Sequence, residues 1–186
     1  MQFIADLWLP IVLSPVLVFV VSSIVHMVLP IHRGDYGRLP NEDDVLADMR
    51  TRGVPPGQYM FPCPPSMKDM GTPEFQEKFE KGPVGWMVVK PTGAPCIGKS
   101  LAQWFGFTLL VSVLVAYLAS FTLEHGLAYG PVFRFTSTAA FLGYGVYAIQ
   151  DSIWKGQRWS TSLKFVFDGL LYALVTAGAF AGFWPR

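Results

Sequence analysis

Four long stretches of apolar residues alternate with polar segments along the chain. They cover residues 7 to 29, 101 to 123, 133 to 153 and 163 to 184. A helix needs about 20 residues to cross about 30 Å of hydrocarbon, and each stretch is close to that length. The pattern predicts an all-α integral membrane protein with four transmembrane helices. The third stretch is the least uniform, because Arg134 lies at its start and Asp151 near its end.

The segment between the first two stretches is the only sizeable polar part of the chain. It holds 11 of the 15 prolines, which argues against a regular independent fold. It is nevertheless rich in aromatic residues, unlike most disordered segments. We expect a mostly irregular loop with two short helices, one after Asn41 that ends before Gly53 and one from Pro73 that ends before Gly82. Residues 86 to 90 are a candidate strand. The predicted organisation is a first transmembrane helix (1–30), a loop or cap (31–100) and a three-helix transmembrane part (101–186).

Lysine and arginine positions predict how the chain is oriented. Nine lie between the first two spans, and Lys155, Arg158 and Lys164 lie between or just inside the last two, whereas the opposite side has only Arg134 and Arg186. Positive charge stays cytoplasmic, so the long loop is expected in the cytoplasm and both termini outside, in a cell (inner) membrane. The first stretch is interpreted as a true span, because no basic residue precedes it and its apolar run exceeds that of a signal peptide. Cys63 and Cys96 then lie in a reducing compartment, where a disulfide is not expected.

Composition agrees with this assignment. The chain has 186 residues, of which 52% are hydrophobic and 15% charged. Soluble domains usually carry about 25% charged residues. A net charge of +1 gives no reason to expect nucleic acid as a partner. The expected partners are membrane lipids and other membrane protein subunits.

Residues 93 to 100, with the sequence GAPCIGKS, match the phosphate-binding loop of nucleotide hydrolases. That loop works only between a strand of a parallel sheet and the helix that packs on it. Here the next helix is the second predicted span, and no remaining segment can supply a parallel sheet. We interpret the match as accidental and predict no enzymatic activity.

Three ionisable residues are expected at similar depth, just inside the cytoplasmic boundary: His26, Asp151 and Asp168. Ionisable groups within spans are costly and are default functional candidates, so the three could relay protons or hold a divalent metal. Alternatively, Asp151 with Lys155 and Asp168 with Lys164 are spaced for ordinary ion pairs on a helix surface. A bis-histidine haem site is not expected, because His125 lies on the opposite side and His32 outside the membrane. No cofactor is predicted.

Other candidate residues belong to packing or to contacts. Small residues at spacing four suggest close helix packing at Ala139 with Gly143 and at Gly178 with Gly182. Soft ligands cluster at Met60, Cys63, Met67 and Met70, which suits Cu(I) but equally suits gap filling. Candidate contacts with a partner or with lipid are Arg33, Arg38, Phe75, Phe79 and Trp86.

The function favoured by these observations is non-catalytic. We expect an accessory or structural subunit of a larger, bacterial-type membrane protein complex, which packs through its helices and docks through its cytoplasmic loop. One alternative is a small transporter or proton-coupled carrier that uses His26, Asp151 and Asp168. A second alternative is a membrane protein that handles soft metals.

Overall fold

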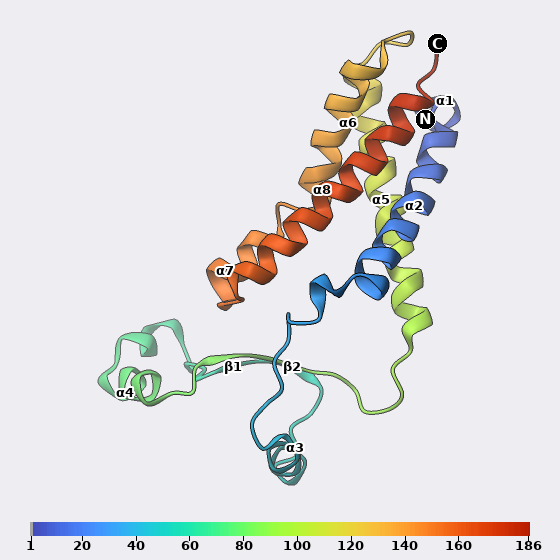
Figure 1. The fold of residues 1–186 in the computed structure, drawn as a ribbon. Coiled ribbons are helices and arrows are strands. Elements are labelled where there is room, and N and C mark those ends of the chain that lie inside the picture. Colours follow the sequence, from blue (N-terminus) through green and yellow to red (C-terminus); the bar gives the residue numbers. More distant parts are fainter. Residues whose placement is uncertain (1) are drawn as a thin grey trace. The chain divides into compact units, whose positions relative to one another are not determined.

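The structure is a computed structural model that describes residues 2 to 186 (Figure 1). The chain divides into two compact units. The helical unit comprises the residues up to Asp35 together with Cys96–Arg186, and the loop unit comprises Tyr36–Pro95. Residues 31 to 35, which the sequence analysis places in the loop, therefore belong with the helices. Their position matters because two side chains of the candidate site come from them.

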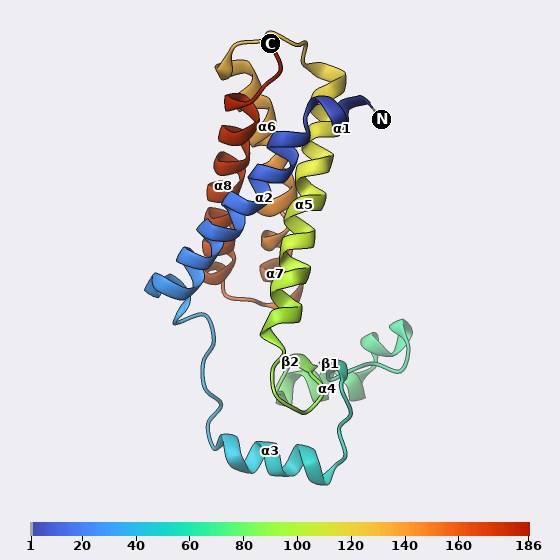
Figure 2. The same ribbon diagram turned by 90° about the vertical axis from the view of Figure 1, so that its right-hand side faces the viewer.

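The helical unit contains six α-helices, a π-helical turn and a 3-10 turn within the described residues. In chain order these are α1 (Gln2–Asp6), α2 (Trp8–Ser23), the π turn η1 (Ile24–Val28), the 3-10 turn η2 (Pro30–His32), α5 (Ile97–Thr122), α6 (Tyr129–Tyr144), α7 (Ala148–Lys155) and α8 (Trp159–Gly182). Helices α2, α5, α6 and α8 run side by side, and the two chain ends lie at the same end of this unit (Figures 1 and 2). The protein is thus mostly helical.

Three helical segments of the described chain are long and apolar enough to cross a membrane: Trp8–Val28, Ile97–Thr122 and Trp159–Gly182. They correspond to the first, second and fourth predicted spans. The single helix expected over residues 133 to 153 is not observed. Helix α6 ends at Tyr144 and α7 begins at Ala148. With 16 residues, α6 is about 24 Å long at about 1.5 Å per residue.

The break between α6 and α7 coincides with a glycine contact. A Cβ atom added to Gly169 of α8 would lie 2.6 Å from the backbone nitrogen of Gly145. Backbone atoms cannot move aside as a flexible side chain can. The two backbone segments therefore approach this closely only because both residues lack a side chain. Small residues do mediate helix packing here, but at a pair that the spacing rule did not select.

The predicted small-residue pairs lie in less demanding positions. A Cβ on Gly143 would lie 3.3 Å from a methyl group of Val111 in α5, whereas one on Gly178 would come no closer than 3.9 Å to the Tyr129 hydroxyl. Nothing lies within 4 Å of the corresponding position at Gly182. Ala139 is partly buried and packs against the hydrophobic core.

The interior of the helical unit contains polar side chains beside its hydrophobic core, and many apolar side chains lie on its outside. The buried polar residues of α2, α5, α6 and α8 include Ser14, Thr108, Ser112, Thr136, Asp168 and Thr176. The exposed apolar residues of the long helices include Val12, Val16, Val20, Leu110, Leu114, Leu118, Phe167, Leu170 and Leu174. A helix that is apolar on its exposed face as well fits a hydrocarbon environment.

One interior contact shows how the helices satisfy their polar groups. Pro15 has no backbone N–H, so the carbonyl of Ile11, four residues earlier, loses its partner within α2. The Ser112 hydroxyl of α5 donates to that carbonyl at 3.0 Å and lies 2.8 Å from the Ser14 hydroxyl oxygen. Because the Ser112 hydroxyl donates its only proton to the Ile11 carbonyl, its oxygen accepts a hydrogen bond from the Ser14 hydroxyl. This arrangement joins α2 to α5 and leaves no donor or acceptor unpaired among the three groups.

The loop unit is built from short elements. They are α3 (Glu42–Thr51), β1 (Gly57–Phe61), the 3-10 turn η3 (Met67–Gly71), α4 (Pro73–Lys81) and β2 (Gly85–Val89). Helices α3 and α4 have the predicted bounds, and the Thr72 hydroxyl caps α4 by accepting the backbone N–H of Phe75 at 3.3 Å. The predicted strand pairs antiparallel with β1, from Gly57 opposite Val89 to Phe61 opposite Gly85. Strand β1 was not anticipated.

Candidate functional site

A turn in the chain after α2 builds the first half of the candidate site. Pro30 disfavours helical geometry at the preceding residue, and Leu29 is accordingly extended, with ψ of 142°. The helix widens into η1 just before this point and the chain turns back in η2 just after it. Wide helical turns of this type occur frequently at functional sites. His26 lies in η1 and His32 ends η2.

The turn stacks the two histidine rings. Their centroids are 4.3 Å apart and their planes differ by 28°. His32 therefore faces His26 although it comes from no other span. The sequence analysis placed His32 outside the membrane from its position after the apolar stretch, whereas the turn at Pro30 brings its ring against His26. The ring of Phe165, from α8, lies 5.3 Å from that of His32 and flanks the pair.

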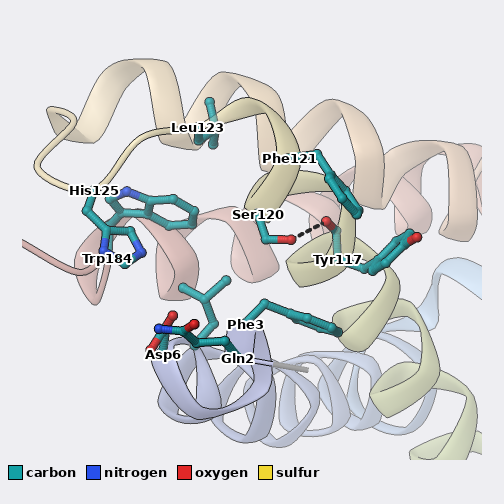
Figure 3. Close-up of a pocket in the computed structure, with 10 residues that line it drawn as sticks. Gln2, Phe3, Asp6, Tyr117, Ser120, Phe121, Leu123, His125 and Trp184 are labelled. Carbon is teal, nitrogen blue, oxygen red and sulfur yellow. Dashed lines mark hydrogen bonds between the residues drawn. The ribbon is translucent and has the colours of Figure 1, made fainter.

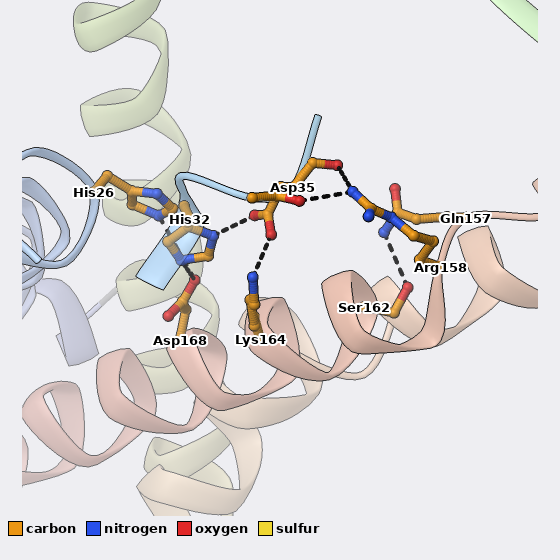
Figure 4. A network of polar contacts seen from close by, with 9 residues as sticks. His26, His32, Asp35, Gln157, Arg158, Ser162, Lys164 and Asp168 are labelled. Atoms are coloured by element: carbon orange, nitrogen blue, oxygen red, sulfur yellow. Dashed lines mark hydrogen bonds and ion pairs between the residues drawn. The ribbon is translucent and has the colours of Figure 1, made fainter. Parts of the chain in front are cut away.

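Asp168 of α8 completes what we call the His–Asp cluster, namely His26, His32 and Asp168 (Figure 4). Its Oδ2 atom lies 2.9 Å from Nε2 of His32 and 3.7 Å from Nε2 of His26. The Asp168 side chain is only 2% exposed, whereas that of His26 is 39% exposed. The cluster thus joins a buried carboxylate to a partly exposed histidine.

A second carboxylate, that of Asp35, contacts the ring nitrogen of His32 that does not face Asp168. Asp35 Oδ2 lies 2.6 Å from Nδ1 of His32, and the Lys164 ammonium donates to Asp35 Oδ1 at 2.6 Å. Burial alone raises the pKa of Asp35, but hydrogen bonds from Lys164 and His32 outweigh it and hold that pKa below its ordinary value. Arg158 donates to the backbone carbonyls of Gly34 and Asp35, both at 2.7 Å, and so fixes the segment. Asp35 is therefore an anion in a defined position.

The ion pairs predicted from helix spacing have mixed outcomes. Asp151 and Lys155 do form one, at 2.7 Å, and the hydrogen bond from Lys155 to Asp151 raises the lysine pKa. The predicted pair between Lys164 and Asp168 is wrong, because Lys164 reaches Asp35 instead. Within residues 2 to 186, no hydrogen bond or ion pair joins Asp151 to His26 or Asp168. The structure thus brings two of the three predicted residues together and adds His32 and Asp35.

The other predicted residues lie elsewhere. Arg33 is exposed, and Arg38 pairs with Glu42 at 3.0 Å on the surface. Phe75 of α4 is buried, and its ring centroid lies 5.8 Å from that of Phe79, which is more exposed. Trp86 is exposed on β2. Of the soft-ligand residues, Met60 lies on β1, and Cys63, Met67 and Met70 lie in or around η3. Both cysteines are free and exposed.

The segment that resembles a phosphate loop does not have the required surroundings. Residues 93 to 96 are irregular and α5 begins at Ile97. The preceding strand, β2, pairs antiparallel with β1, and these two strands form the whole sheet within the described chain. A phosphate loop needs a parallel sheet behind it.

A hollow of about 430 Å³ lies at the end of the helical unit that carries both termini (Figure 3). Its lining residues are Gln2, Phe3, Asp6, Leu7, Tyr117, Ser120, Phe121, Leu123, His125 and Trp184. The Ser120 hydroxyl donates to the carbonyl of Tyr117, and the Trp184 indole donates to the carbonyl of Glu124. These two polar groups are thus satisfied by backbone carbonyls nearby.

Comparisons of the chain with protein-family models, with curated proteins and with solved structures find no match. Two imidazoles and a buried carboxylate within contact distance can hold a divalent cation or exchange a proton.

Proposed function

We propose that the protein is a multi-pass membrane protein that crosses the bilayer four times. Three segments are long and apolar enough to span it. Helices α6 and α7 together run beside α8 in the opposite direction (Figures 1 and 2). If α8 crosses, its antiparallel neighbour crosses as well, and the break at Gly145 lies within that fourth crossing. The distribution of lysine and arginine favours a cytoplasmic loop unit with both termini outside the cell (inner) membrane.

Within that membrane, we propose a non-catalytic role as an accessory subunit of a larger complex. The observation that carries this proposal is the surface of the loop unit. Among its large apolar side chains only Phe75 is fully buried. Trp86 and Val88 are each more than half exposed. They are two residues apart on β2, so their side chains lie on the same face of the sheet. Met60 of β1 is paired opposite Trp86 and lies on that face as well. An exposed aromatic and aliphatic patch of this kind fits the apolar cytoplasmic surface of another membrane protein subunit.

We expect replacement of this patch to release the partner. In the double variant Trp86→Ser with Val88→Ser, stoichiometric co-purification after mild detergent extraction should be lost, while the protein still folds. Tryptophan anchors at interfaces contribute about 2 kcal/mol or more, which corresponds to about a 30-fold weaker complex. The measurement is the native size of the extracted particle and the identity of its components.

Leu46→Ser is the matched control, because Leu46 is an exposed apolar residue of the same unit that lies on α3. It should leave the complex intact. If the wild-type protein is extracted only as a monomer or homo-oligomer, the subunit proposal is wrong.

A further inference from the structure

We propose that the His–Asp cluster binds one divalent transition-metal ion of the zinc type, with His26, His32 and Asp168 as its three protein ligands. One ligand atom from each residue lies within 4.8 Å of the other two. Two imidazoles and one carboxylate suit zinc and its neighbours, whereas magnesium and calcium prefer oxygen ligands alone. This inference does not depend on the proposed role of the loop unit.

The spacing of the ligand atoms fits a metal between them. Zinc lies about 2.0 to 2.2 Å from nitrogen and oxygen ligands, which places the ligand atoms of a tetrahedral site about 3.3 to 3.6 Å apart. The two distances from Asp168 Oδ2, 2.9 Å to His32 and 3.7 Å to His26, lie on either side of that value. The ligand atoms of the two histidines lie within 4.8 Å of each other, so the rings would move closer together on binding the ion.

Asp35 occupies the position of a carboxylate that supports a metal-bound histidine. It lies 2.6 Å from Nδ1 of His32, so Nδ1–H can donate to Asp35 while Nε2 faces Asp168 and would be the atom that binds the ion. Histidines that bind metals commonly donate their second N–H to a carboxylate in this way. Lys164 holds Asp35 from its other oxygen, so the orientation of the His32 ring is fixed by α8 as well.

Among the residues that the structure describes, the buried Asp168 carboxylate meets no side-chain donor other than His26 and His32. Its Oδ2 atom lies 2.9 Å from Nε2 of His32 and 3.7 Å from Nε2 of His26, and its Oδ1 atom has no hydrogen-bond partner within residues 2 to 186. Burying a carboxylate that is only 2% exposed is costly unless opposite charge and sufficient donors face it. A divalent cation between the three residues would supply that charge and would use the lone pairs of both stacked rings at once.

The cluster is accessible and leaves room for a solvent ligand. His26 is more than a third exposed, so an ion can enter from its side. Three protein ligands leave the fourth position of a tetrahedral metal to water, as in sites that exchange ligands. The three residues come from both η1 and η2 on one side and α8 on the other, so the ion would fasten the end of the first span to the fourth.

The test is metal binding by the full-length protein in detergent after chelator treatment. Titration calorimetry with zinc chloride should give one tight site per chain, and Co²⁺ should give the visible absorption bands of a tetrahedral site. His32→Gln and Asp168→Asn should each weaken zinc binding at least 100-fold. Asp35→Asn, which removes a positioning residue, should weaken it about 10- to 100-fold and keep the Co²⁺ bands.

His125→Gln is the control, because it removes a histidine at the opposite end of the helical unit. It should bind zinc as the wild type does. His26→Gln keeps the test valid if Asp168→Asn does not fold, because His26 is partly exposed and its replacement leaves no buried unpaired charge. The proposal is overturned if the wild type binds no stoichiometric zinc, or if His26→Gln and His32→Gln bind as tightly as His125→Gln.

Discussion

Gly169→Ala is expected to prevent stable folding of the helical unit. The new methyl group would meet the backbone of Gly145, with 2.6 Å to its nitrogen and 2.8 Å to the carbonyl carbon of Tyr144. The collision is between backbone atoms on both sides, since Gly169 lies inside α8 and Gly145 lies where α6 ends, so neither segment can move aside as a flexible side chain would. Overpacking usually costs about 1 to 3 kcal/mol, and a collision with backbone on both sides should exceed that range. The measurement is the yield and thermal unfolding of the purified protein in detergent.

Gly182→Ala provides the control for this prediction. It introduces the same methyl group in the same helix, at a position with no other atom within 4 Å. Its stability should stay within about 0.5 kcal/mol of the wild type. A Gly169→Ala protein that unfolds at the same temperature as Gly182→Ala would show that α6 and α8 do not cross at these glycines.

Lys164→Met is expected to destabilise the helical unit by about 3 kcal/mol. It removes the ammonium that pairs with Asp35, whose side chain is 2% exposed, and so leaves a buried carboxylate with only His32 as a side-chain partner. Breaking one side of a buried ion pair costs about 3 to 5 kcal/mol, and the partial exposure of Lys164 favours the lower end. Thermal unfolding at neutral pH measures the effect.

Lys155→Met is the matched control for Lys164→Met. Lys155 also pairs with an aspartate, Asp151, but at the surface, where screening by water leaves an ion pair little net value. Its replacement should give no measurable change in unfolding temperature. Equal unfolding temperatures for the two variants would contradict the structural importance of the pair between Asp35 and Lys164.

The similar depth of His26 and Asp168 could be predicted from the sequence, whereas their contact and the rest of the cluster could not. Both residues lie one turn inside the same ends of two apolar stretches, so their depth follows from hydropathy alone. His32 and Asp35 follow the apolar stretch and were assigned to solvent. The available signal was Pro30, which forces the chain to turn immediately after the helix. Pairing between Asp35 and Lys164 depends on that turn, and local helix spacing instead favoured Asp168 for the lysine.

The third stretch shows a similar limit. Hydropathy located its apolar residues but could not show that the helix breaks at Gly145, where the backbone lies against Gly169 of a different helix. Spacing of small residues within one helix selects surfaces that can pack and does not identify the partner. In the loop unit, strand β1 was missed because five residues after two prolines carry little periodicity, and only the pairing with β2 defines it.

We propose that the chain crosses the membrane with Tyr36–Pro95 inside and both termini outside. Thiol labelling tests it most directly, because Cys63 and Cys96 are the only cysteines and both are exposed. A membrane-impermeant maleimide should leave both unlabelled in intact cells and label them after permeabilisation, whereas Arg186→Cys, in a protein with both native cysteines replaced by serine, should be labelled in intact cells. Labelling of Cys63 in intact cells, or protection of the cysteine at position 186, would contradict the account.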